Sequence, residues 1–269
     1  TMITALIDAD IVAFRAAALA DGDDPFEPGT KRKDMTLDDC EQIARFQISE
    51  IMHECATDQA VLVWSPDDRK NFRKSVSKSY KQSRAPGSKP RYYWDLVQSM
   101  RSEFTSIDVG GMEGDDLLGI LQTGDFYEDT IIVSSDKDML TIPGRSYNHV
   151  RHEFQDVSVN QANWYWMYQT LMGDSTDGYP GAKGIGRVKA ERMLPKVDDS
   201  DPVSFMKRLW HEVQLGFCAT HDHEQIGIFQ AIKQARLARI LRHDDYDWER
   251  KAIRLWHPTD DVWYPVSQI

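Results

Sequence analysis

Carboxylates gather in short clusters along this chain, and their pattern fits the binding of hard divalent cations. The clustered acids are Asp8, Asp10, Asp68, Glu113, Asp115, Asp116, Asp136, Asp138, Asp174 and Asp177. Mg²⁺ and Mn²⁺ prefer oxygen ligands, and the sequence has no Cys/His cluster that would indicate zinc. Two such ions about 4 Å apart can activate a water and stabilise the leaving oxygen in phosphodiester cleavage.

Each acidic cluster also has an ordinary structural interpretation. Glu113 and Asp116 are three residues apart, so they would share one side of a helix start, where the helix dipole favours acids by about 0.3–1 kcal/mol. Residues 134–138 are typical of a turn after a strand, and residues 173–178 have generic turn composition. A calcium loop at residues 21–25 is rejected, because the glycine and glutamate that such a loop requires are missing.

A basic segment supplies the second half of the functional hypothesis. The net charge of −11 at first argues against nucleic acid, because phosphates usually bind to a basic surface. Ten of the eleven excess negative charges are the clustered acids, however, and residues 69–94 contain nine Lys or Arg and no Asp or Glu. The acidity is therefore local, and the remainder of the chain is almost neutral.

Within this basic segment, Lys70, Lys74, Lys78 and Lys81 recur at helical spacing, which predicts a cationic stripe on one helix face. The aromatic residues that interleave it are Phe72, Tyr80, Tyr92, Tyr93 and Trp94. Cations neutralise phosphates while aromatic rings stack on bases, which suits single-stranded or frayed DNA ends. A solvated helix face is the alternative, but such faces usually mix charges of both signs.

A glycine-rich turn at residues 181–190 could also approach a phosphate. Gly184 and Gly186 flank Ile185 in a predicted hairpin that opens a helix carrying Lys189. Glycines let the backbone come close to a phosphate, and amides at a helix start can donate to it. An ordinary loop before a helix is the alternative interpretation.

Three short apolar runs must position the acids. They are residues 3–7, 60–64 and 130–134. Continuous β-branched runs without polar alternation predict strands that are buried on both faces of a parallel sheet. The helical patterns between them cover roughly residues 36–56, 92–103 and 115–122. We therefore predict an α/β fold, a mostly parallel central sheet flanked by helices, in which ligands bind beyond the carboxyl ends of the strands.

Bulk properties agree with a globular protein. The chain has 269 residues, of which 41% are hydrophobic and 28% charged, and we expect one nuclease domain over residues 1–269 with a helix and strand extension over 195–269. In that extension a helix is expected at residues 226–241 and a strand at 252–256. No apolar run is long enough for a membrane span, and the N-terminus lacks a signal pattern. The three cysteines are scattered, so we expect reduced thiols in a cytoplasmic protein.

In sequence order these motifs resemble those of the 5′→3′ exonuclease and flap endonuclease superfamily, most closely the 5′→3′ exonucleases of short-tailed phages. The resemblance spans roughly residues 3–194. The matching pieces are residues 7–10 with Arg15 downstream, 71–74, 80–84, 113–116, 135–138, 173–178 and the glycine hairpin.

The resemblance implies two Mg²⁺ ions, for which Mn²⁺ can substitute. The acids that would gather the first ion are Asp8, Asp68, Glu113, Asp115, Asp116, Asp136 and Asp138, with Asp10 nearby. Asp174 and Asp177 would serve the second ion. The family has one acid after the second strand, whereas Asp67 and Asp68 are adjacent here; Asp68 is chosen for its distance of five residues from Arg73.

The resemblance also implies a DNA-binding surface. Lys81 and Arg84 would sit at the base of a helical arch over about residues 69–94 and contact the scissile phosphate. They would form the catalytic set together with Glu113, Asp116 and Asp136. The other expected DNA contacts are Arg15 at the terminal nucleotides, and Arg73, Lys74, Lys78, Tyr80, Lys183, Gly184, Ile185, Gly186 and Lys189. A helix-hairpin-helix-type motif over about residues 173–194 would grip duplex backbone, in relatives with a bound K⁺.

The expected activity is hydrolysis of phosphodiesters at 5′ ends of duplex, nicked or flapped DNA by a monomer. It would act in the cytoplasm, that of a bacterial host if the protein is phage-encoded, and an RNA–DNA hybrid is a further candidate substrate. The alternatives are a structure-specific flap endonuclease, a PIN-like ribonuclease and a non-catalytic DNA-end-binding protein.

Overall fold

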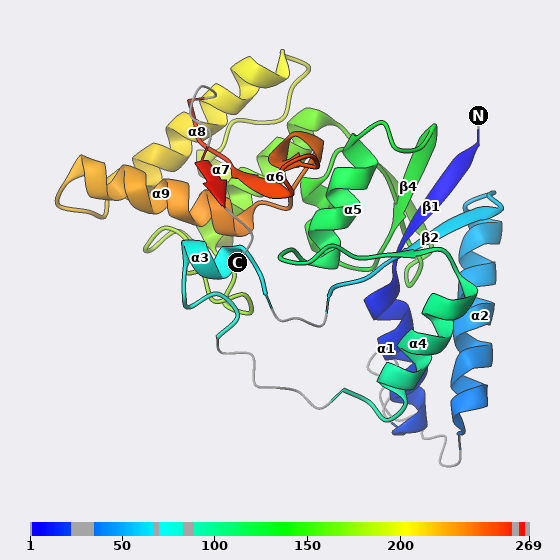
Figure 1. Cartoon of the computed structure of the whole chain (residues 1–269). Helices are drawn as coiled ribbons and strands as arrows, with labels where there is room; N and C mark the ends of the chain where they lie inside the picture. Colours follow the sequence, from blue (N-terminus) through cyan, green and yellow to red (C-terminus); the bar gives the residue numbers. More distant parts are fainter. Residues whose placement is uncertain (1, 23–34, 67–69, 83–88, 260–263, 267–269) are drawn as a thin grey trace.

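The computed structural model describes residues 2–22, 35–66, 70–82, 89–259 and 264–266. At its centre lies a six-stranded sheet in the order β3-β2-β1-β4-β5-β6 (Figure 1). Its strands are β1 (Ile3–Asp8), β2 (Gln59–Val63), β3 (Ser106–Ile107), β4 (Asp129–Val133), β5 (Gly144–Asn148) and β6 (Glu153–Val157). Neighbouring strands from β3 to β5 pair in parallel, and β6 is antiparallel to β5. The predicted mostly parallel sheet is confirmed.

The central strand β1 explains why its sequence lacks polar alternation. It pairs with β2 on one side and β4 on the other, so its backbone groups are satisfied within the sheet. Successive side chains point to opposite faces of a sheet. Leu6 and Ile7 are nevertheless both fully buried, because helices cover each face.

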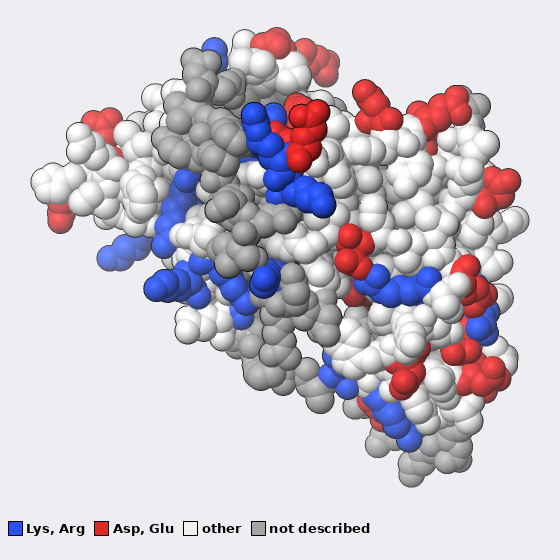
Figure 2. All heavy atoms as spheres, viewed as in Figure 1, with Lys and Arg blue, Asp and Glu red and all other residues white. Residues whose placement is uncertain are grey.

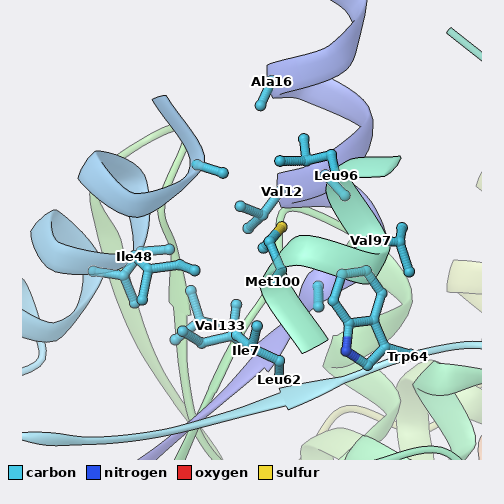
Figure 3. Packing of buried hydrophobic residues seen from close by; sticks show 14 of the residues in the cluster. Ile7, Val12, Ala16, Ile48, Leu62, Trp64, Leu96, Val97, Met100 and Val133 are labelled. Atoms are coloured by element: carbon cyan, nitrogen blue, oxygen red, sulfur yellow. The ribbon is translucent and has the colours of Figure 1, made fainter. Parts of the chain in front are cut away.

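Three helices cover the first face of the sheet: α1 (Ala9–Ala20), α2 (Leu37–Glu54) and α4 (Tyr93–Glu103). Figure 3 shows side chains of all three packed against the sheet, with Val12 of α1, Ile48 of α2 and Met100 of α4 near Ile7 and Val133. The predicted helices at residues 36–56 and 92–103 are therefore confirmed, with ends within two residues. A capping box starts α2, in which the side chains of Thr36 and Asp39 each accept a hydrogen bond from the other's backbone N–H.

Helix α5 (Gly114–Thr123) covers the second face together with the C-terminal part of the chain. That part contains η2 (His243–Asp245) and a small antiparallel sheet of β7 (Tyr246–Asp247), β8 (Ala252–Leu255) and β9 (Tyr264–Val266). A side chain at Gly119 of α5 would put its Cβ 2.2 Å from the carbonyl oxygen of Leu241. Glycine at this position lets the C-terminal segment approach the helix closely.

A third hydrophobic cluster holds the remaining helices together, on the side of the molecule away from α1, α2 and α4 (Figure 1). They are α6 (Val159–Met172), α7 (Arg187–Met193), α8 (Pro202–Cys218) and α9 (Glu224–Ala238), and the short η1 (Lys137–Thr141) packs on α6. The expected helix at residues 226–241 and strand at 252–256 correspond to α9 and β8.

The predicted cationic stripe along one helix face is wrong for residues 70–82, while the arch as a whole stays a prediction because residues 83–88 lie outside the described part of the chain. Helix α3 (Arg73–Val76) is a single turn, Ser77 is extended, and Lys81 has a left-handed φ of 52°. Serine side chains offer the backbone local alternatives to a helix. Ser75 Oγ, for example, donates to the Phe72 carbonyl at 2.6 Å.

The structure also bears on two bulk expectations. Over the residues described, no helix combines the length and the apolar character needed to cross a bilayer. Cys40, Cys55 and Cys218 are all free thiols, as their scattered positions predict.

Candidate active site

The carboxyl ends of β1 and β4 lie side by side because these strands pair in parallel. Asp8 ends β1, and Asp136 follows β4. Ser134 Oγ donates a 2.8 Å hydrogen bond to Asp8 Oδ2 and so joins the two strand ends. Helix α5 begins at the same edge and brings Asp115 within electrostatic reach of Asp8 and Asp136. Asp8 and Asp136 therefore lie together at the carboxyl ends of two strands, as predicted, and the charge of Asp115 from α5 adds to this acidic region.

Burial and mutual repulsion raise the pKa values of these acids. Burial raises the pKa of Asp8 to about 7; the Ser134 hydrogen bond opposes this shift, and the charges of Asp10 and Asp136 add to it. Burial also raises the pKa of Asp115 well above its usual range, and the negative charges of Asp8 and Asp136 raise it further. A nearby cation stabilises carboxylates of this kind. The electrostatics of the cluster therefore suit a divalent ion.

Lys81 lies inside the acidic region rather than on an exposed stripe. Its ammonium group forms an ion pair with Glu113 Oε1 and lies 3.8 Å from Asp177 Oδ1. Burial alone would raise the pKa of Glu113, but the charges of Lys81 and Arg73 lower it to about 2. Glu113 is therefore ionised and already paired.

Lys137 makes a similar connection between two other acids. Its Nζ lies 2.8 Å from Asp138 Oδ1 and 3.5 Å from Asp174 Oδ2. Gln169 of α6 is buried and donates a 2.6 Å hydrogen bond to the same Asp138 oxygen. The sequence interpretation missed Gln169, although a buried amide in an apolar helix is a signal that could have indicated it.

The described residues contain no group of three or more His, Cys, Asp or Glu side chains that is arranged to hold one ion. Lysines and amides already partner several of the expected ligands. The donor set consists of carboxylate oxygens, and it therefore fits Mg²⁺ or Mn²⁺ rather than a softer metal. The expected two-ion site stays a prediction, and it requires these side chains to turn towards shared points.

Asp116 and Arg73 have a different role from the one expected. Arg73 Nη1 and Nη2 each donate a 2.7 Å hydrogen bond to Asp116, and the two side chains are 3% and 0% exposed. Arg73 Nε also donates to the Leu237 carbonyl at 3.0 Å. Buried and occupied in this way, Arg73 does not present a DNA contact and Asp116 does not present an open metal ligand. The pair instead links the start of α5 to the end of α9 in the interior.

The basic segment presents its aromatic rings differently from the stacking surface expected. Phe72, Tyr80 and Tyr93 are buried, and Tyr80 Oη donates a 2.9 Å hydrogen bond to Glu113. Tyr80 therefore positions an acid instead of offering a face to a base. Trp94 is 52% exposed and lies edge-on to Tyr93, so it is an accessible ring of this segment.

Asp10 is fixed by two hydrogen bonds that the sequence interpretation did not predict. Ser65 N donates to Asp10 Oδ2 at 2.8 Å, and Tyr93 Oη donates to Asp10 Oδ1 at 2.9 Å. Ser65 Oγ in turn accepts from Gly114 N at 3.0 Å. Ser65 follows β2 and Ser134 follows β4. Their positions just after strand ends could have indicated from the sequence that these serines hydrogen-bond to the site acids.

The loop at residues 173–181 docks against the basic segment. Lys81 N donates to the Asp177 carbonyl at 2.8 Å. A Cβ at Gly178, which has φ of 76°, would lie 2.7 Å from the Ser79 carbonyl oxygen. The approach of the two segments therefore requires glycine at this position, and it carries Asp174 and Asp177 to the acidic cluster.

The glycine hairpin is exposed at its glycines and anchored by its isoleucine. A Cβ at Gly184 or Gly186 would have no heavy atom within 4 Å, whereas Ile185 is 5% exposed and belongs to the third hydrophobic cluster. The Ile185 side chain thus holds the hairpin rather than contacting DNA. Lys183 and Lys189 flank the hairpin and are exposed.

The remaining predicted residues have varied positions. Lys70, Lys74 and Lys78 are exposed, and Figure 2 shows Lys and Arg gathered over α3 while Asp and Glu predominate over the part that contains the sheet. Arg15 lies on α1, half-buried, where its charge acts on His149. Asp68, its alternative Asp67, and Arg84 lie outside the described residues.

The chain matches a family model described as the 5′-3′ exonuclease, N-terminal resolvase-like domain, over residues 4–166. That match covers more than half of the chain. The chain belongs to the 5′-3′ exonuclease family. Within this family it is 30% identical to the exodeoxyribonuclease of Enterobacteria phage T3 and to the exonuclease of Escherichia phage T7, each over 74% of this chain and 74% of the relative.

Solved structures show the same fold for this member of the 5′-3′ exonuclease family. A bacteriophage T5 D15 flap endonuclease, in a pseudo-enzyme–product complex with DNA and metal ions, aligns with a TM-score of 0.53 and 13% identity over 87% of this chain and 99% of that one. A T5 5′-exonuclease with bound zinc aligns with a TM-score of 0.54 over 88% and 100%. At this identity the likeness concerns the fold.

Proposed function

We propose that this family member is a divalent-metal-dependent 5′→3′ exodeoxyribonuclease that acts at 5′ ends of duplex, nicked or flapped DNA. The observation that carries the proposal is that Asp8 and Asp136 lie at the carboxyl ends of two parallel strands and share Ser134, with Asp115 at the start of α5 within electrostatic reach of both. Membership in the family supports the type of reaction. The T3 and T7 phage relatives are named exodeoxyribonuclease and exonuclease, and the match covers 74% of each of them.

The ions would be two Mg²⁺, with Mn²⁺ as a substitute. Asp8, Asp115 and Asp136 would hold the first ion, and Asp174 and Asp177 would serve the second, as the resemblance implies. We reassign Asp138 from the first ion to the second, because it shares Lys137 with Asp174. When bound, the ions would supply the positive charge that activates water and stabilises the leaving oxygen. No covalent protein nucleophile is needed.

The protein's own residues would position the DNA. Lys81 lies among the acids and would contact the scissile phosphate, where its charge offsets the charge that develops during cleavage. Arg84, which lies outside the described residues, would contact the same phosphate, as the family resemblance implies, and Arg15 would help place the terminal nucleotides. The exposed Gly184 and Gly186 backbone would contact duplex, with K⁺ bound at the hairpin as a further proposal.

Replacing Asp136 with Asn tests the proposal directly. Mg²⁺-dependent digestion of a 5′-labelled duplex should disappear, while DNA binding in a gel-shift assay survives because the basic surface is unchanged. Asp199→Asn, at an exposed acid in the segment before α8, is the matched control and should digest normally. Unchanged cleavage by Asp136→Asn would end the proposal.

Product analysis distinguishes the related activities. With Mg²⁺, mononucleotides released from a nick and a blunt end indicate an exonuclease, and intact released flaps indicate structure-specific cutting. Cleavage of 5′-labelled RNA in preference to nicked DNA indicates a PIN-like ribonuclease, and digestion of a hybrid shows tolerance for RNA. End binding without nucleotide release indicates a non-catalytic end-binding protein.

We also propose that the protein acts as a monomer in the cytoplasm, that of a bacterial host if it is phage-encoded. Its three free cysteines agree with a reducing compartment. Light scattering in dilute solution measures the mass, for which 30.9 kDa is expected. A mass of twice that value would contradict the monomer.

A further inference from the structure

Two lysines make the same kind of connection at the acidic site. Lys81 bridges Glu113 at the start of α5 to Asp177, and Lys137 bridges Asp138 after β4 to Asp174. In each case one acid belongs to the sheet edge and the other to the loop at residues 173–181. Each ammonium group thus lies between two carboxylates that come from different parts of the chain.

The acids around Lys137 are held in place by other groups. Gln169 donates to Asp138 Oδ1, and Thr176 N donates to Asp174 Oδ1 at 2.8 Å. Removal of the lysine charge would therefore leave two carboxylates facing each other instead of letting them separate freely. A cation between two like charges at short range stabilises both of them in their charged form.

The two lysines differ in how easily they can leave. The side chain of Lys81 is 19% exposed, whereas that of Lys137 is 57% exposed. A lysine head on a flexible four-carbon stem can move into water at little cost when it is already half exposed. Lys137 is therefore the cation that an incoming ion displaces more easily.

We propose that Lys137 occupies the position of a divalent cation between Asp138 and Asp174 in the metal-free protein, and that it sets the metal affinity of this pair by competing with the ion. The proposal rests on the proposed function, in which Asp138 and Asp174 serve the second ion. Lys137 is a positioning residue in this role, since it acts through the two acids and not on the DNA.

Titration with Mn²⁺ alone, without DNA, tests this competition. Isothermal titration calorimetry should resolve two Mn²⁺ sites of different affinity. At the weaker site the dissociation constant of Lys137→Met should be lower than that of the wild type by about threefold or more, because no ammonium group has to be displaced. Lys137→Arg keeps a competing cation and should bind like the wild type. Lys207→Met removes an exposed lysine on α8 and controls for the loss of one positive charge.

Thermal unfolding supplies a second measurement that does not depend on activity. In EDTA, Lys137→Met should melt at a lower temperature than the wild type, because Asp138 and Asp174 lose their neutralising partner. In saturating Mn²⁺ the two proteins should have the same melting temperature.

The outcomes separate the two proposals. Equal Mn²⁺ affinity for the wild type and Lys137→Met overturns the competition and leaves the nuclease function standing. Weaker binding by Lys137→Met overturns it as well, since the lysine would then assist the ion. If neither protein binds Mn²⁺, both proposals fail.

Discussion

Arg73 and Asp116 form a two-pronged ion pair in the interior, with two hydrogen bonds of 2.7 Å between side chains that are 3% and 0% exposed. The same guanidinium donates to the carbonyls of Leu237 and Arg239 at the end of α9. One side chain of the basic segment thereby joins α5, which supplies acids to the site, to the C-terminal part of the chain. We therefore expect the Arg73–Asp116 pair to hold the start of α5, and with it the acids there, in position.

Replacing Arg73 with Met should lower the free energy of unfolding by about 3–5 kcal/mol, because an uncompensated carboxylate would remain in the interior. Urea unfolding measures the loss. Arg145→Met is the control: its pair with Asp129 is more than one-third exposed and contributes at most about 1 kcal/mol. Similar losses for the two variants would show that the buried pair does not have the supporting role assigned to it.

The stability of the metal-free protein should depend on pH through Asp8. The pKa of Asp8 is about 7 in the folded state, against an ordinary value of 3.8, so the folded protein holds a proton that the unfolded chain releases. The free energy of unfolding therefore falls as pH rises through this window and levels off above it. Asp8→Asn removes the titrating group and keeps an acceptor for Ser134.

The check is urea unfolding of both proteins in EDTA at about pH 5 and about pH 8. The wild type should lose more stability between these values than Asp8→Asn, by on the order of 1 kcal/mol or more. Parallel losses in the two proteins would argue against a raised pKa at Asp8.

Two glycines should respond differently to alanine. Gly186→Ala should leave the melting temperature unchanged, because φ at this residue is −91° and a Cβ meets no heavy atom within 4 Å. It should nevertheless weaken binding to duplex DNA if the phosphate backbone approaches there. Duplex affinity equal to that of the wild type would remove the hairpin from the DNA-binding surface.

Gly178→Ala is the contrasting case. Alanine would be strained there, because φ is 76° and its methyl group would lie 2.7 Å from the Ser79 carbonyl oxygen. We expect a loss of about 1 kcal/mol or more in the free energy of unfolding. An unchanged value would mean that the loop at residues 173–181 can move away from the basic segment at no cost.

The exposed lysines of the basic segment should determine the salt dependence of DNA binding. Changing Lys70, Lys74 and Lys78 to Gln together should reduce the slope of log K against log salt by up to about 2–3, since each phosphate contact releases counterions. Fluorescence anisotropy with a 5′-tailed duplex in EDTA measures the slope. The control Lys207→Gln should have the same slope as the wild type. An unaltered slope in the triple variant would mean that DNA does not bind to these three lysines.

Much of the architecture follows from local pattern. The apolar runs before Asp8 and Asp136 lack polar alternation, and such runs become strands buried on both faces. Parallel strands bring their carboxyl ends to one edge, so acids after β1 and β4 had to meet there. The basic segment was less predictable, because serines at 75, 77 and 79 offset the helical spacing of its lysines.

The sequence by itself determined where the acids of β1, β4 and α5 stand on their own elements, since strand ends and helix starts depend on neighbouring residues. Tertiary structure alone decided which cations they pair with. Glu113 and Asp116 share one helix start, yet of these two Lys81 pairs only with the partly buried Glu113, whereas Arg73 holds the fully buried Asp116 and also contacts Glu113 at 3.4 Å. The physical reason is that each ion pair joins residues distant in sequence, and its burial depends on how α5, α9 and the basic segment pack together.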